Sequence, residues 1–248
     1  MSIALIIVRQ MPSVWEGYAL VQIGQIGQVG QIGQVGQDIE PPAQAVGRMM
    51  NPSFMNEVVD SGKFSIQKES STFLLYKESF KAKQLPNTDL IELKVRGYSR
   101  EDVQALLMKN VSALRQIHDE LIKPSVQNFK KNLALADMVI NDVKSIMNWA
   151  QKRMMTGRVN TTEVALYTML VQQKASELQA LEQRKLSIEE QLSPARTYPT
   201  SLVGKIYVGN KPVSSKKELI ISIAALLGLL VATLLAFLHY SYGRVYQK

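Results

Sequence analysis

The chain has 248 residues, of which 46% are hydrophobic and 20% charged, so it is long enough to fold into one large domain or two small ones. It contains no cysteine, which excludes disulfides, thiol catalysis and cysteine-ligated metal sites. The net charge is +8, but the basic residues are spread along the chain without a nucleic-acid-binding motif, so a solvated surface or membrane proximity explains the charge better.

The first segment, MSIALIIV, is apolar but too short to cross a bilayer, and it lacks the basic start of a signal peptide. Three interpretations stay open: a truncated first transmembrane segment, a start codon placed too late, or a short buried strand. We expect residues 1–12 to be the remnant of a first transmembrane segment.

A strand followed by a repeat comes next. WEGYALVQI (15–23) has the composition of a strand, although Gly17 weakens it. Residues 23–37 are five tandem triplets of Ile or Val, Gly and Gln. A period of three matches neither a half-buried strand nor an α-helix, and surface loops tolerate insertions at small entropic cost. We interpret the repeat as padding in a loop; the alternative is a strip of Ile and Val at a subunit interface.

Two short elements are predicted before the middle of the chain. PPAQAVGRMMNPSFMNEVVDSG (41–62) indicates one or two helices, because prolines stand at its start and a glycine at its end. DLIELKVRG (89–97) is the clearest strand, since its alternation predicts one buried and one exposed face: Ile91, Leu93 and Val95 against Glu92, Lys94 and Arg96.

A long helix is predicted from Ser99, with Asp102 in a capping-box-like position, to about Met155. Pro124 should kink or restart it. Apolar residues then repeat in alternating steps of three and four, the pattern of a heptad seam: Val126, Phe129, Leu133, Ala136, Ile140, Val143, Met147, Ala150 and Met154.

A second helix, about 161–192, is predicted to return after the turn TGRVN, with Asn160 and Glu163 as its cap. Its seam is weaker because Lys174 and Lys185 occupy seam positions among the apolar ones: Tyr167, Val171, Leu178, Leu181, Ile188 and Leu192. We expect an extended antiparallel hairpin; the alternative is two helices in a compact bundle.

Residues 219–238 are 20 residues without a charge, which at about 1.5 Å per residue would span a bilayer of about 30 Å. Small residues recur every fourth position and predict a packing face for another helix: Ala224, Gly228, Ala232 and Ala236. Four lysines precede the span and two basic residues follow it, which would place the preceding chain in the cytoplasm. That rule loses force when the flank is a large domain.

The sequence offers no catalytic, cofactor-binding or metal-binding residue. It has no P-loop, HExxH or GxSxG motif. His118 stands in the middle of the first long helix, where a solvated or packed side chain is the favoured interpretation over a ligand.

The order of these segments resembles the polysaccharide co-polymerases, the Wzz-type chain-length determinants of O-antigen and related surface polysaccharides. The resemblance covers about residues 13–243 and is most specific in NTDLIELKVRGYS (87–99) and in KPVSSKK (211–217). Two features depart from the family: its first transmembrane helix is only a fragment here, and its second approach proline, expected near Ser215, is missing. From that motif, only Pro212 is carried over, together with Lys216 and Lys217 at the membrane approach.

The resemblance implies an α+β fold with a membrane-proximal base, a long helical hairpin and a C-terminal transmembrane helix. The expected divisions are 1–12, the membrane remnant; 13–99, the first part of the α/β base, with the repeat loop 23–37; 100–195, the hairpin; 196–217, the return to the base and the membrane approach; 218–239, the transmembrane helix; and 240–248, a short cytoplasmic tail.

The implied function is non-enzymatic control of polysaccharide chain length, with no cofactor. The implied localisation is the bacterial inner membrane, with both termini cytoplasmic and the bulk of the chain periplasmic. The implied partners are further copies of the chain in a ring, a separate polysaccharide polymerase, membrane lipid and the growing polysaccharide, but no nucleic acid. The alternative from another class is a membrane-tethered coiled-coil adaptor of a polysaccharide export complex.

Overall fold

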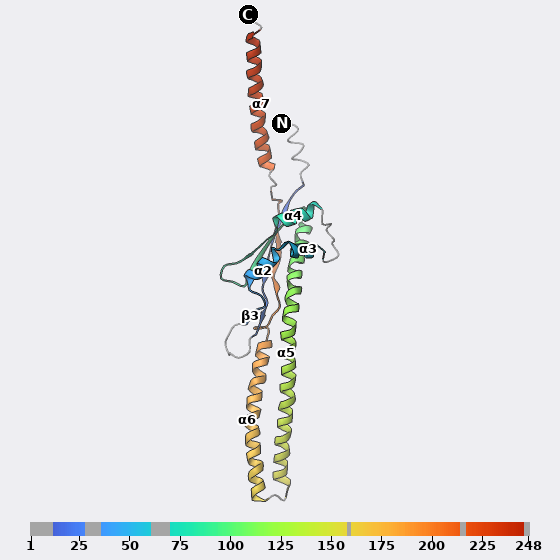
Figure 1. Cartoon of the computed structure of the whole chain (residues 1–248), viewed down its shortest axis with the longest axis vertical. Helices are drawn as coiled ribbons and strands as arrows, with labels where there is room; N and C mark the ends of the chain where they lie inside the picture. The colour runs from blue at the N-terminus through green and yellow to red at the C-terminus, as the bar shows by residue number, and fades with distance from the viewer. Residues whose placement is uncertain (1–11, 28–35, 61–69, 158–159, 214–216, 246–248) are drawn as a thin grey trace.

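The computed structural model of the chain describes residues 12–27, 36–60, 70–157, 160–213 and 217–245. The molecule is elongated, with a mixed α/β base at its middle (Figure 1). Two long helices extend from the base in one direction and a third helix extends in the other (Figure 1). The predicted mixture of helix and sheet and the predicted long helix are confirmed.

The base is built on a four-stranded sheet of order β4-β5-β1-β6, in which every neighbouring pair is antiparallel. The first strand of the chain therefore lies inside the sheet, between strands that come much later in the sequence. The strands are β1 (Trp15–Gln22), β4 (Lys81–Gln84), β5 (Leu90–Gly97) and β6 (Ser201–Val208). A separate two-stranded ribbon pairs β2 (Gln25–Ile26) with β3 (Gln37–Asp38).

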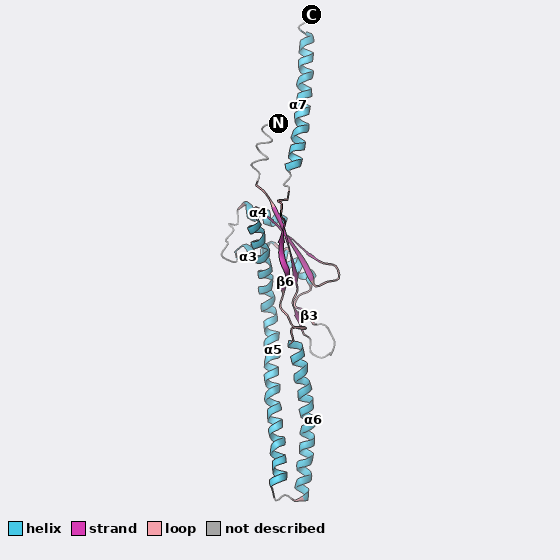
Figure 2. Cartoon of the chain, turned by 180° about the vertical axis from the view of Figure 1, so that it is seen from behind, coloured by secondary structure: helices cyan, strands magenta, loops and turns pink. Residues whose placement is uncertain are grey.

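One face of the sheet carries the core. The alternation predicted for 89–97 is confirmed, because Ile91, Leu93 and Val95 are all 0% exposed. The start of α5 and three short helices cover this face, and the opposite face stays open behind them (Figures 1 and 2). The short helices are α2 (Pro42–Met49), α3 (Pro52–Asp60) and α4 (Ser71–Ser79). Each large aliphatic side chain fully buried in this layer stabilises the base by roughly 1.5–3 kcal/mol.

The hairpin consists of α5 (Arg100–Thr156) and α6 (Thr161–Leu192). Both predicted caps are present: Ser99 accepts from the backbone N–H of Asp102, and Asn160 forms a capping box with Glu163. The helices differ in length because α5 first crosses the base, burying apolar residues against the sheet, and meets α6 only beyond it. The residues of α5 buried in the base core are Val103, Leu106, Leu107, Val111 and Leu114.

The predicted seam holds the two helices together. Ala136, Ile140, Val143 and Ala150 are buried, and the other predicted seam residues of both helices are buried or half-buried. The lysines that weaken the second seam find acidic partners. Lys185 reaches across to Asp137 at 2.7 Å, and Lys174 pairs with Glu177 within its own helix at 2.6 Å.

Pro124 is predicted to kink or restart the helix; a restart does not occur, since α5 continues through this residue. A proline inside a helix removes one backbone hydrogen bond and clashes with the preceding turn. Here the turns on both sides are held from outside. Ile122 is buried on the side of the base, and the seam with α6 begins a few residues later. The packing of the helical turns before and after Pro124 therefore outweighs the free-energy cost of a proline inside the helix.

The predicted C-terminal helix is observed as α7 (Lys217–Val245), which extends away from the base on the side opposite to the hairpin (Figure 1). Within the residues that the structure describes, no helix combines the length and apolarity needed to cross a membrane. The crossing itself stays a prediction. The prediction for the N-terminal remnant concerns residues 1–12, of which 1–11 lie outside the described residues.

Candidate functional site at the base of the hairpin

The two outer segments of the base, the first strand and the return segment, come together in the sheet. β1 pairs with β6, so that Tyr18 faces Tyr207. Beyond the strands the pairing continues to Val14 and Val213, where the N–H of Val213 donates to the carbonyl of Val14 at 2.7 Å. The two segments by which the chain enters and leaves the base therefore lie side by side, at the end of the base opposite to the hairpin (Figure 1).

A bulge adjusts the register of this pair. Tyr18 faces Tyr207 and Leu20 faces Val203, so three residues of β6 oppose one residue of β1. Gly204 lies in this bulge with a φ of +73°, a conformation that residues with a Cβ rarely adopt. Gly204 and Lys205 do not belong to a P-loop. Gly204 instead allows the backbone to form the bulge.

A buried polar network lies under the start of the hairpin. The Nε2 atom of His118 is 3.1 Å from Oε2 of Glu40, and its Nδ1 atom is 2.5 Å from Oγ1 of Thr200. Thr200 also accepts from the N–H of Gly24 at 2.9 Å, and Arg48 donates to Glu40 at 2.9 Å. His118 and Thr200 are 0% exposed and Glu40 is 5% exposed. The network thus joins α5, the loop before α2 and the start of β6.

The hydrogen bonds define the protonation pattern of the network. Burial alone would raise the pKa of Glu40, but the hydrogen bonds from Arg48 and His118 outweigh burial and hold that pKa below its ordinary value. An ionised Glu40 only accepts, so Nε2 of His118 donates to it; in the neutral imidazole Nδ1 is then an acceptor. Thr200 accepts from Gly24 and donates its single hydroxyl proton to Nδ1. The carboxylate of Glu40, the ring of His118, the hydroxyl of Thr200 and the N–H of Gly24 therefore all have partners.

The arrangement has the order hydroxyl, imidazole and carboxylate that nucleophilic catalysis uses. A nucleophile must be reached by its substrate, yet the hydroxyl and the imidazole are fully buried. In the described residues no three His, Cys, Asp or Glu side chains are placed to hold a metal ion. The hydrogen bonds of the network join segments that are distant in the chain, and His118 is packed, which agrees with the favoured sequence interpretation.

The sequence interpretation did not identify Glu40 and Thr200 as partners of His118. Glu40 stands directly before Pro41 and Thr200 precedes β6, some 80 residues on either side of the histidine. One signal for burial was available. His118 is four residues from Leu114 and four from Ile122, on one apolar stripe of α5.

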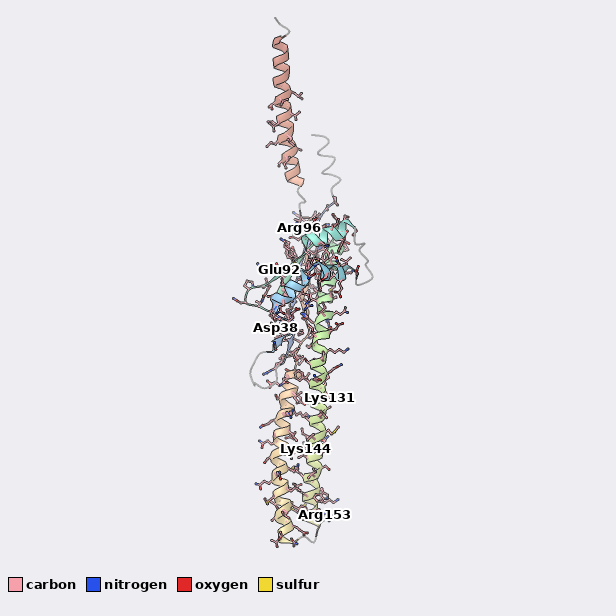
Figure 3. The ribbon with its side chains drawn as sticks, in the orientation of Figure 1. Asp38, Glu92, Arg96, Lys131, Lys144 and Arg153 are labelled. Carbon is pink, nitrogen blue, oxygen red and sulfur yellow. The ribbon has the colours of Figure 1, made fainter. Side chains whose placement is uncertain are left out.

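A second polar cluster lies on the open face of the sheet, which we define by the outward side chains of β1, β5 and β6. Glu16 contacts Lys94 at 2.8 Å and Arg96 at 2.7 Å, and the hydroxyl of Tyr18 donates to it at 2.5 Å. Figure 3 labels Arg96 in this part of the base. Burial alone would raise the pKa of Glu16, but hydrogen bonds from Lys94, Tyr18 and Arg96 lower it to about 2.

The ends of the glycine repeat are packed against the return segment. A Cβ added to Gly24, Gly27 or Gly36 would lie 2.5 to 2.6 Å from backbone atoms of residues 191–200. These glycines therefore permit close approach of two backbones. The interpretation as loop padding is wrong for these flanks, while residues 28–35 of the repeat lie outside the described residues.

The predicted helix-packing face lies on α7. Ala224 is half-buried and the other three residues are exposed: Gly228, Ala232 and Ala236. A Cβ added at Gly228 would meet nothing within 4 Å. Pro212 is exposed beside the β1–β6 pair. Lys216 and the side chain of Lys217 lie outside the described residues. The roles of these residues stay predictions.

No protein-family model and no curated protein matches the sequence. Solved structures do match, and they come from the family that the sequence motifs resemble. A full-length bacterial polysaccharide co-polymerase is 15% identical over 94% of this chain and 87% of its own, with a TM-score of 0.37. A Wzz dodecamer is 13% identical over 81% of this chain and 99% of its own, with a TM-score of 0.24. The wild-type lipopolysaccharide O-antigen chain-length regulator of Shigella flexneri is 14% identical over 81% and 100%, with a TM-score of 0.27.

Proposed function

We propose that this protein is a non-enzymatic regulator of the chain length of a surface polysaccharide of the O-antigen type. It acts as an oligomeric co-polymerase beside a separate membrane polymerase. The proposal is supported by the sequence motifs at 87–99 and 211–217 and by where these segments fold. The first forms β5 and the cap of α5, and the second leads from β6 toward α7.

The observation that carries the proposal is the geometry of the chain ends. Val14 and Val213 are paired on one side of the base, and the hairpin extends from the other side (Figure 1). A base held at a membrane surface through these ends would project its hairpin away from the membrane. With 57 residues, α5 is about 85 Å long, of which the first turns lie along the base. Such a projecting element suits contact with a long polymer better than chemistry on a small molecule.

The membrane arrangement is part of the proposal. The uncharged segment 219–238 of α7 crosses the bacterial inner membrane, the base and hairpin are periplasmic, and residues 240–248 form a cytoplasmic tail. Pro212 shapes the entry into the span. The face formed by Ala224, Gly228, Ala232 and Ala236 packs membrane helices of neighbouring subunits, while the base provides most of the contact between them.

The regulator works through assembly and position, since the polymerase performs the bond-forming step. In this proposal His118 and its partners maintain the angle at which α5 leaves the base, and they take no part in a reaction. Membrane lipid and the growing polysaccharide are further partners.

The decisive experiment compares the lipopolysaccharide ladder of the source strain with that of a clean deletion of this gene and of a complemented deletion. We expect a clustered modal band that collapses to a short, steadily decaying distribution and returns on complementation. If the ladder and the capsular and secreted polysaccharides all keep their length, the proposal is wrong. Co-purification then distinguishes the alternative, because an export adaptor would be recovered with an exporter and a co-polymerase with a polymerase.

A further inference from the structure

A polar cavity of about 440 Å³ opens between α2, α3 and α5, directly outside the buried network. Glu40 and Arg48 form its inner wall, and Gln44, Asn51 and Glu57 stand around it. Its volume lies within the range of about 300–1,000 Å³ that is usual for small-molecule sites.

The inner wall offers a hydrogen-bond donor. Arg48 directs Nε and Nη2 at Glu40, with the shortest contact at 2.9 Å. Among the described residues, its Nη1 nitrogen has no hydrogen-bond partner. The salt bridge with Glu40, which is itself bonded to His118, holds the guanidinium in place. The donor is therefore preorganised before a ligand arrives.

The rim offers both donors and acceptors. The Oδ1 atom of Asn51 accepts from the backbone N–H and the hydroxyl of Ser53, at 2.9 and 2.7 Å, so its amide nitrogen is left to donate. The side chains of Gln44 and Glu57 are exposed and make no hydrogen bond or ion pair with other described residues. Gln44 can donate and accept, while Glu57 accepts.

An apolar surface completes the cavity. The lining includes Phe54, which is 4% exposed, and Ile117, which is half-buried. Few apolar atoms beside several converging polar groups give a site that distinguishes ligands by hydrogen bonding.

The charges of the lining disfavour an anionic ligand. The positive charge of Arg48 is matched by Glu40, and Glu57 adds a second carboxylate, so an anion would meet net repulsion. A hydroxyl group donates and accepts, which suits a wall of mixed donors and acceptors. We propose that this cavity binds one neutral sugar residue of the polysaccharide, an inference that rests on the function proposed above.

The chain provides a position from which to test the cavity without disturbing the fold. Gly47 lies in the cavity wall, and a Cβ added there would meet nothing within 4 Å. Replacing a mid-helix glycine also favours the helix. Gly47→Trp should therefore fill the cavity, while Leu74→Trp places the same ring on α4, outside the cavity, at a side chain that is 56% exposed.

The test uses the full-length oligomer in detergent and, as the probe, the O-polysaccharide released by mild acid from the lipopolysaccharide of the source strain. Binding is measured by saturation-transfer NMR and titration calorimetry. We expect Gly47→Trp to weaken binding at least tenfold, Gln44→Ala at least threefold, and Leu74→Trp less than twofold. Circular dichroism must be the same for all four proteins.

Three results would overturn the inference: absence of binding to the wild type, wild-type affinity in both cavity variants, or displacement of the polysaccharide by inorganic phosphate. The ladder separates this from failure of the proposed function. If the deletion alters the ladder and Gly47→Trp complements it fully, the cavity is not used. If the deletion leaves polysaccharide length unchanged, the proposed function itself is wrong, whatever binds in the cavity.

Discussion

Replacing Thr200 with valine should loosen the attachment of the hairpin to the base. Valine has nearly the shape of threonine but can neither accept from the N–H of Gly24 nor donate to Nδ1 of His118, contacts of 2.9 and 2.5 Å. Each buried group left without a partner costs about 1–3 kcal/mol. Because the valine methyl stays packed, we expect Thr200→Val to lower the free energy of unfolding of the base by about 2–4 kcal/mol.

The two tryptophans of the chain allow this change to be measured in the right part of the molecule. Trp15 lies in β1, with Arg100 5.6 Å from its ring, and Trp149 stacks edge-on with Tyr167 in the hairpin at 5.7 Å. In a Trp149→Phe background, fluorescence reports the base alone. Thermal unfolding of the full chain in detergent should then show a midpoint lowered by about 5–15 °C.

A matched variant isolates the hydroxyl. Thr200→Ser keeps both hydrogen bonds and loses one methyl group, so it should cost only about 1 kcal/mol. Thr162→Val changes an exposed threonine near the start of α6 and should leave the midpoint of Trp15 fluorescence where it is. Equal midpoints for Thr200→Val and Thr200→Ser would refute the claim that the network holds the hairpin to the base.

Three further predictions concern other parts of the chain. Because the pKa of Glu16 is lowered from 4.5 to about 2, its ion pairs contribute about 3 kcal/mol above pH 4.5 and lose that contribution as the pH falls toward 2. The stability difference between wild type and Glu16→Gln in urea should shrink over that interval, and a constant difference would contradict the assignment. Gly24→Ala should destabilise the base by about 1–3 kcal/mol in the same urea assay, since its Cβ would lie 2.6 Å from the backbone of Tyr198 and Thr200. The control Gly47→Ala should be neutral or slightly stabilising. Equal effects of the two substitutions would contradict the close approach of the Gly24 backbone to residues 198–200. Ala232→Leu should shorten or randomise the polysaccharide ladder and reduce the oligomer measured by cross-linking, and if both stay as in the wild type the packing face on α7 does not exist.

Periodicity accounts for what the sequence could predict. Alternation in 89–97 placed Ile91, Leu93 and Val95 in the core, and the steps of three and four placed Ile140 and Ala150 on the hairpin seam. The caps at Ser99 and Asn160 were predictable because their partners stand three residues away. All of these signals are local in the chain.

The unpredicted features depend on contacts between distant segments. The partners of His118 are 78 and 82 residues away, and no periodic pattern connects them. Continuity of α5 at Pro124 depends on packing against the base and α6, which overrides the local preference. The flanking glycines of the repeat are needed because the backbone of 191–200 passes within contact distance of them. The sequence of the repeat alone does not indicate this contact.

The position of the hairpin within the chain has a mechanical consequence. β5 and β6 both run antiparallel to β1, and the hairpin is the connection between them, so everything on the hairpin side of the base is one insertion into an otherwise complete sheet. Seven residues removed from each helix at matched heights would keep the seam in phase and shorten the reach by about 10 Å. Removing three or four from one helix would instead rotate its seam away from its partner. The hairpin is thus an arm whose length can change in steps of one heptad while the base and the pairing of Val14 with Val213 stay as they are.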